Sequence, residues 1–254
     1  MSGSILSSTS PYTINKKVKV SRYTFSEPLK VIVGPNAEEF FINEEFICKQ
    51  SRYFKTVCRK AWQSGRLRTV TLVDDDPRLF AIFLFWLAKG DIESSSDFIE
   101  ITDPEYTEGE MIEKRCEQWE QLRRCYNLGD DLLAPAFKNA VMDCLITVSD
   151  YLITDHKLFP CRMVQELEII YETTYPGSGL RKLIVDLAVK YLDLESVENL
   201  DVSRACLADF YSEMLGRVCT LLKDCTEEDA ADTVYLAYPW EIDSSDYHDK
   251  PNFV

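Results

Sequence analysis

The sequence of 254 residues is 46% hydrophobic, which is enough to bury a core of ordinary size and excludes a wholly disordered chain. Its formal net charge of −15 argues against a general affinity for the nucleic-acid backbone, so no direct contact with nucleic acid is expected. The longest apolar run, residues 79–88, is too short to cross a bilayer whose hydrocarbon core is about 30 Å thick, so no membrane segment is expected.

Nine cysteines are scattered through apolar helical patterns, and none of them forms a Cys-x-x-Cys pair. They are Cys48, Cys58, Cys116, Cys125, Cys144, Cys161, Cys206, Cys219 and Cys225. Their odd number and the lack of an N-terminal signal peptide favour free, buried thiols in a reducing compartment. The sequence therefore predicts an intracellular protein, cytoplasmic or nuclear.

Acidic side chains concentrate in two stretches. Residues 91–120 carry a net charge of −9 and residues 224–254 a net charge of −8, whereas residues 1–90 carry +6. A solvated, mobile loop or chain end is the usual explanation for such stretches, and docking to a basic partner is the alternative. Residues 1–27 are predicted to be disordered, because their first part is rich in Ser and Thr and has few large apolar groups.

The first predicted element is a β-hairpin. A β-branched run at residues 31–33 is closed by the turn residues Gly34-Pro35-Asn36 and followed by a second apolar run at residues 39–42. A glycine beside a strand could instead cradle a phosphate. The Lys-Ser/Thr ending of a phosphate-binding loop is missing, so the turn is favoured.

An amphipathic helix is predicted next, over residues 44–58, and a strand over residues 68–73. Three aspartates and Pro77 then mark the start of a helix, because carboxylates stabilise free N–H groups and proline suits the first helical position. The aspartates could also hold Mg²⁺ or Ca²⁺, but no carboxylates follow at EF-hand spacing, so capping is favoured.

The helix that begins there, residues 78–89, is apolar around its whole circumference and must be buried on most sides. Gly90 suits its C-terminal cap, and Ile92 is expected to begin another short strand. The acidic residues 93–117 lack sustained periodicity and are expected to form an inserted loop.

Helical periodicity dominates from Trp119 onward. Apolar stripes predict helices over residues 119–128, 133–148, 164–171, 180–191 and 202–222. The expected organisation is thus a first domain over residues 28–150, a helical extension over residues 151–223 and an acidic tail over residues 224–254.

Two patterns in the first half of the chain are distinctive. The first is a strand end, an apolar pair and a Ser-x-Tyr-Phe group, formed by Phe40, Ile42, Asn43, Phe46, Ile47, Ser51, Tyr53 and Phe54. The second is an Asp-Pro-x-x-Phe-x-x-x-Leu-x-Trp helix closed by glycine, formed by Asp76, Pro77, Phe80, Leu84, Trp86 and Gly90. In this order they resemble the core of a BTB/POZ domain of the fungal type, with Asn43 where that family usually has His. Most of these residues are expected to pack in the core rather than to contact a partner.

The resemblance continues downstream and covers roughly residues 28–192. Residues 122–132 resemble the helix and turn that close such domains, and residues 171–176 with 180–186 look like a helical segment common in fungal BTB proteins. The resemblance implies an α+β fold, in which a small sheet is flanked by helices and an all-helical extension follows. It also implies homo- or heterodimerisation and a role as substrate adaptor for a cullin-type ubiquitin ligase, through the surface around the helix that starts at Asp76.

The sequence holds no specific catalytic motif. The two histidines, His156 and His248, are peripheral, and no zinc-type Cys/His spacing or nucleotide-binding glycine pattern occurs. We therefore expect no enzyme activity, no cofactor and no metal site. The alternatives are a transcriptional or chromatin adaptor that reaches DNA only through partner proteins, and an enzyme with an unfamiliar site.

Overall fold

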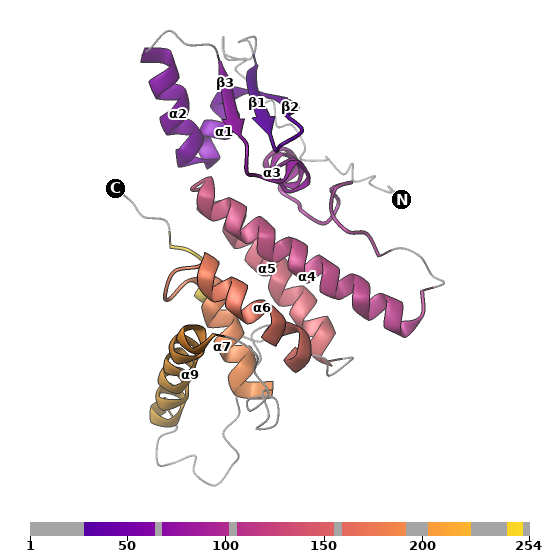
Figure 1. Ribbon diagram of the computed structural model, residues 1–254, viewed down its shortest axis with the longest axis vertical. Coiled ribbons are helices and arrows are strands. Elements are labelled where there is room, and N and C mark those ends of the chain that lie inside the picture. Colours follow the sequence, from indigo (N-terminus) through magenta and orange to yellow (C-terminus); the bar gives the residue numbers. More distant parts are fainter. Residues whose placement is uncertain are drawn as a thin grey trace, which may run out of the picture.

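The computed structural model describes residues 28–63, 68–101, 106–154, 159–191, 203–224 and 243–250. A small three-stranded sheet lies at one end of the molecule with its own helices, and longer helices form the rest (Figure 1). The mixed α+β class is as predicted. The segment 1–27, His156 and residues 225–242 of the acidic tail lie outside the described residues. None of the described helices combines the length and apolar character needed to span a bilayer.

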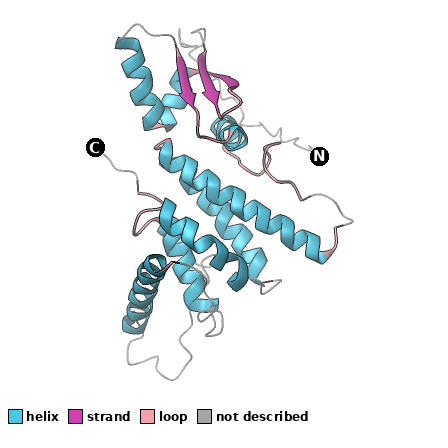
Figure 2. Ribbon diagram, in the orientation of Figure 1, coloured by secondary structure: helices cyan, strands magenta, loops and turns pink. Residues whose placement is uncertain are grey.

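The sheet joins a hairpin to one later strand (Figure 2, magenta). Strand β1 (Leu29–Val33) pairs antiparallel with β2 (Glu38–Ile42) and parallel with β3 (Thr69–Leu72), which gives the order β2-β1-β3. The predicted hairpin and third strand are confirmed. Side chains alternate between the faces of a strand, and one face is buried here. Its buried members are Leu29, Val31, Val33, Val70 and Leu72.

The single helix predicted over residues 44–58 is instead two helices, α1 (Glu44–Gln50) and α2 (Arg52–Gln63). Ser51 breaks the helix because its backbone is extended, with φ −121° and ψ 119°. Its hydroxyl accepts a hydrogen bond from Phe54 N at 3.1 Å and donates one to Leu132 O at 2.6 Å. The serine thus ends one helix, caps the next and fastens both to a distant turn.

Helix α3 (Pro77–Lys89) begins and ends as the sequence predicts. The Asp76 carboxylate accepts a hydrogen bond from Arg78 N at 2.9 Å, and Gly90 adopts the left-handed conformation, with φ 76°. The expected strand at Ile92 is wrong. Residues 91–98 form bends and turns that bury Ile92 and Phe98 against the core.

The expected acidic loop over residues 93–117 is also wrong over its second half, because helix α4 (Glu108–Asp131) begins at Glu108. A capping box starts it. Thr107 Oγ1 accepts from Glu110 N at 3.3 Å, and the Glu110 carboxylate accepts from Thr107 N at 2.8 Å. This reciprocal pair offsets the weak helical periodicity of the acidic residues that follow.

Among the described residues, four further helices follow: α5 (Pro135–Thr154), α6 (Phe159–Thr173), α7 (Gly179–Tyr191) and α9 (Arg204–Asp224). Helices α4 and α5 run side by side as an antiparallel pair through the middle of the molecule (Figure 1). The domain boundary expected at residue 150 falls inside α5, so helix α5 belongs to both parts.

The described part of the acidic tail, residues 243–250, is not a solvated, mobile end. It contains the short 3-10 helix η2 (Ser244–Asp246) and packs against the helical half. Tyr247 is only 3% exposed and belongs to the hydrophobic core. The expectation of a solvated end is therefore corrected for this segment, because its aromatic side chain is buried.

Replacing Ser51 with Ala is expected to lower the free energy of unfolding by about 1–2 kcal/mol, because Phe54 N is left without its buried acceptor. Chemical denaturation measures the change. The exposed Ser96 provides the control, since Ser96→Ala is expected to change stability by less than about 0.5 kcal/mol. Equal effects of the two substitutions would show that the hydroxyl of Ser51 does not hold the break between α1 and α2.

Candidate functional site

The aromatic residues of the family-like motifs meet in one cluster under the sheet. The Phe80 ring lies 5.2 Å from that of Phe40, edge to face, and 6.2 Å from that of Phe54. Phe54 and Phe80 are fully buried. The other large apolar members of the motifs are partly buried and pack against the same core: Phe40, Ile42, Tyr53, Leu84 and Trp86. These side chains stabilise the fold and leave little of their surface for a partner.

Asn43, which stands where the resembled family has His, has a local structural role. Its side-chain oxygen accepts a hydrogen bond from Phe46 N at 3.2 Å, so it caps helix α1. Asparagine is among the best residues for this position. The departure from the family pattern therefore keeps a well-formed helix start.

A surface recess of about 620 Å³, here called the α3 groove, lies beside the start of helix α3. The hairpin turn, the end of β3 and the helices α3 and α4 line it. Its described lining residues are Pro35, Asn36, Glu38, Asp74, Asp75, Asp76, Pro77, Arg78, Leu79, Arg124, Asn127, Leu128 and Asp131. This is the surface around Asp76 that the sequence singles out for partner binding.

The α3 groove is acidic. Burial and the nearby carboxylate of Asp131 raise the pKa of Asp75, and burial and Asp130 raise the pKa of Asp131. Arg124 offsets part of this charge through an ion pair with Asp76, with 2.8 Å between Nη2 and Oδ2. The described lining holds no histidine or cysteine, and its titratable groups are carboxylates and arginines.

A second feature of the surface is apolar. Phe41, on edge strand β2, is 62% exposed, and Phe46, on α1, is 45% exposed. Their sequence neighbours Phe40 and Ile47 face the core instead. Two large aromatic side chains within six residues are thus left in contact with water.

One group of possible metal ligands occurs among the residues that the structure describes. The ligand atoms of Glu44, Cys48 and Cys58 all lie within 4.8 Å of one another. Burial raises the pKa of the Cys58 thiol to about 12 and also raises that of Cys48, so both are thiols at neutral pH. This trio carries no signal in the sequence, because its two cysteines are ten residues apart and are brought together by the break at Ser51.

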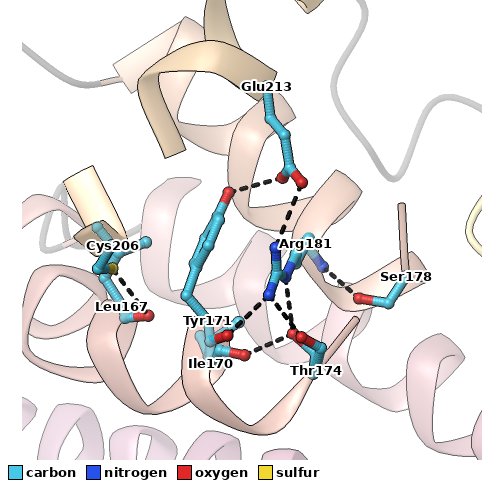
Figure 3. A network of polar contacts seen from close by, with 8 residues as sticks. All are labelled: Leu167, Ile170, Tyr171, Thr174, Ser178, Arg181, Cys206 and Glu213. Carbon is cyan, nitrogen blue, oxygen red and sulfur yellow. Dashed lines mark hydrogen bonds and ion pairs between the residues drawn. The ribbon is translucent and has the colours of Figure 1, made fainter. Parts of the chain in front are cut away.

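The most connected polar site surrounds Arg181, near the start of helix α7 (Figure 3). Its side chain is 4% exposed, and its guanidinium group lies 4.2 Å from the centre of the Tyr171 ring. Nη2 donates to the carbonyl oxygen of Tyr171 at 2.7 Å, and Nε donates to Thr174 Oγ1 at 3.0 Å. Nη2 also donates to the carbonyl oxygen of Thr174 at 2.5 Å, so three of the five N–H donors of the arginine are used within α6 and the turn that follows it.

Helix α9 joins this network through Glu213 (Figure 3). One oxygen of its carboxylate accepts from Tyr171 Oη at 2.7 Å, and the other lies 3.5 Å from Arg181 Nη1. Burial and the hydrogen bond to Glu213 raise the pKa of Tyr171. The network ties together three helices, α6, α7 and α9, and its arginine has no exposed face to offer a ligand.

Neither the search of protein-family models nor the search of curated proteins gives a match to this chain. Function therefore has to be inferred from the geometry of the chain itself and from the resemblance of its motifs.

The described residues do not assemble a catalytic unit around a histidine. His248 contacts the exposed carboxylate of Asp143, with 2.8 Å between Nε2 and Oδ1, and His156 lies outside the described residues. A nucleophile, a base and an orienting acid at hydrogen-bond distance would be needed for that chemistry. The features that stand out are instead the α3 groove and the exposed phenylalanines.

Replacing Arg181 with Met is expected to lower the free energy of unfolding by about 3 kcal/mol, because the partners of a buried cation lose their interactions. Thermal and chemical denaturation give the change. Lys182→Met is a matched control, since Lys182 is the next residue of the same helix and is exposed. If both variants lose the same stability, the buried network does not hold the three helices together.

Proposed function

We propose that this chain is a protein–protein interaction module of the BTB/POZ type, which associates with a second copy of itself and serves as an adaptor. The order of elements and the motif residues support this proposal: hairpin, two short helices, a parallel strand and a buried helix follow one another along residues 29–89. The absence of a catalytic arrangement among the described residues makes binding the simpler function.

The observation that carries the proposal is the exposure of Phe41 and Phe46. Burying a phenylalanine side chain that is otherwise exposed contributes about 1.5–3 kcal/mol. In a two-fold symmetric dimer each such residue is buried twice, because the same surface occurs on both copies. A second copy of the chain is therefore the partner that we propose for these two side chains, because it presents the same exposed groups.

Recruitment to a cullin-type ubiquitin ligase is the finer form of the proposal. It rests on the resemblance and on the position of the α3 groove, which lies at the start of the helix that the resemblance singles out. A ligase adaptor needs one surface for its own dimer and another for the scaffold. Phe41 and Phe46 are not among the lining residues of the α3 groove, although strand β2 contributes Glu38 to it.

The double variant Phe41→Asp/Phe46→Asp is expected to convert a concentration-dependent dimer into a monomer of 29.3 kDa. Light scattering coupled to size-exclusion chromatography measures the mass over a range of loading concentrations. Leu215→Asp is the control, because Leu215 on α9 is 63% exposed and lies outside the proposed surface. A wild-type chain that remains monomeric at every concentration would refute self-association.

Saturable binding to a purified cullin scaffold is expected for the full chain, and Arg78→Glu is expected to weaken it at least tenfold, because Arg78 is an exposed residue of the α3 groove. Biolayer interferometry gives the affinities. Lys89→Glu makes the same charge change at the exposed far end of helix α3 and is expected to leave binding intact. A folded wild-type chain that binds no cullin excludes the ligase role and favours a transcriptional or chromatin adaptor.

A further inference from the structure

Residues 243–250, here called the docked segment, contact the helical half in the manner of a bound peptide (Figure 1, yellow). Asn139 of α5 binds both backbone groups of Asp249: Nδ2 donates to the Asp249 carbonyl at 3.2 Å, and Oδ1 accepts from Asp249 N at 2.8 Å. An asparagine side chain has one donor group and one acceptor, so it can pair with a residue of an extended peptide as a neighbouring strand does.

The side chain of Asp249 is recognised by a buried cation. Lys138 of α5 is 1% exposed, and its ammonium group lies 2.6 Å from a carboxylate oxygen of Asp249 and 2.6 Å from one of Asp130. Burial alone would lower the pKa of Lys138, but its hydrogen bonds to these two carboxylates raise it, so the lysine stays charged. A charge-assisted contact of this kind discriminates strongly against a neutral side chain.

Both the side chain and the backbone of Tyr247 contact helix α7. Its hydroxyl donates to Asp186 Oδ2 of α7 at 2.9 Å, while the ring is buried against the core. Its carbonyl oxygen lies so close to Gly179 that a Cβ atom there would be 1.9 Å away. Gly179 does not have a positive φ, so the approach of the docked segment, rather than backbone strain, requires glycine at this position.

We propose that Asn139, Lys138, Asp186 and Gly179 form a peptide-binding site for acidic segments in which a tyrosine precedes an aspartate by two residues. The docked segment is the intramolecular ligand of this site, and a partner protein that carries the same Tyr-x-Asp pattern binds in exchange for it. The inference is independent of the proposed self-association, because Phe41 and Phe46 are not part of this site.

The docked segment and a partner's Tyr-x-Asp segment compete for the same site, and the docked segment has the advantage that it belongs to the same chain. A tethered ligand acts at an effective concentration on the order of 1 mM, so the full chain binds a free peptide weakly while its own segment is bound. Weakening the docked segment without altering the site is then expected to open the site to a peptide. The substitutions Tyr247→Ala and Asp249→Ala do this, because both residues belong to the ligand.

The test uses a fluorescein-labelled peptide with the sequence of residues 243–250 and measures fluorescence anisotropy with full-length chains. We expect the Tyr247→Ala/Asp249→Ala chain to bind this peptide at least tenfold more tightly than the wild-type chain. A peptide with Asp replaced by Asn at the position of Asp249 is expected to bind about tenfold more weakly, because it loses a charge-assisted hydrogen bond.

The site itself is tested by adding Gly179→Ala to the Tyr247→Ala/Asp249→Ala chain, which is expected to abolish peptide binding. Gly216→Ala is the control, because a Cβ at this position in α9 meets nothing within 4 Å. If the Tyr247→Ala/Asp249→Ala chain is folded by circular dichroism and binds no peptide, the proposal is wrong. It is also wrong if Gly179→Ala and Gly216→Ala leave the same affinity.

If the substituted chains do not fold, the proposal is tested on the wild-type chain instead. The backbone amide of Asp249 is followed by NMR in a ¹⁵N-labelled chain while unlabelled peptide is added to millimolar concentration. We expect its hydrogen exchange to accelerate as the peptide replaces the docked segment and removes the bond to Asn139. Unchanged exchange at saturating peptide would overturn the exchangeable-ligand proposal.

Discussion

The contact between the Ser51 corner and the turn that joins α4 to α5 is the constraint on which the first half of the molecule depends. Besides the hydroxyl of Ser51, the backbone N–H groups of Arg52 and Tyr53 donate to the carbonyls of Leu133 and Leu132, at 3.2 and 3.4 Å. Two chain reversals more than 80 positions apart thereby satisfy each other's buried polar groups. Leu133 is held there with a φ of 49°, although its side chain is exposed.

The contact between the Ser51 corner and the α4–α5 turn also determines the positions of neighbouring side chains. Because the corner sets the angle between α1 and α2, it determines that Cys48 and Cys58 meet and that Phe46 points away from the core. Aromatic packing continues from the sheet to the helical half. The Phe137 ring lies 5.1 Å from that of Phe83 and 5.2 Å from that of Trp86. The sheet and the antiparallel pair α4 and α5 consequently share one continuous core.

Features with strong local signals could be predicted from the sequence. The hairpin has its turn residues, and α3 has Asp76 and Pro77 at one end and Gly90 at the other. The break at Ser51 could not be recognised, since apolar periodicity continues across it and the hydrogen bond that causes it comes from Leu132. The start of α4 did carry a signal, the Thr107-x-x-Glu110 box, but the acidic composition of residues 93–117 outweighed it.

The contacts of the docked segment could not be predicted from the sequence, because they join residues that are far apart along the chain. Asn139 and Asp249 are 110 positions apart, and composition alone describes residues 224–254 as a solvated tail. The motif residues are expected from the sequence to be mostly core residues, and their large apolar members do lie in the core or pack against it. The exposed Phe41 and Phe46 stand beside them in the sequence, yet only the three-dimensional arrangement distinguishes the two groups.

The close approach at Gly179 links two distant parts of the sequence in evolution. Alanine in place of a glycine with a negative φ stabilises a protein by about 0.4–1 kcal/mol, because it restricts the unfolded chain, so selection for stability alone would favour alanine at the first position of α7. Only a chain that keeps a segment against this position has a reason to retain glycine. Among descendants of this sequence, we therefore expect Gly179 and the Tyr-x-Asp segment to be inherited as a pair, and a lineage that loses the segment to exchange the glycine soon afterwards.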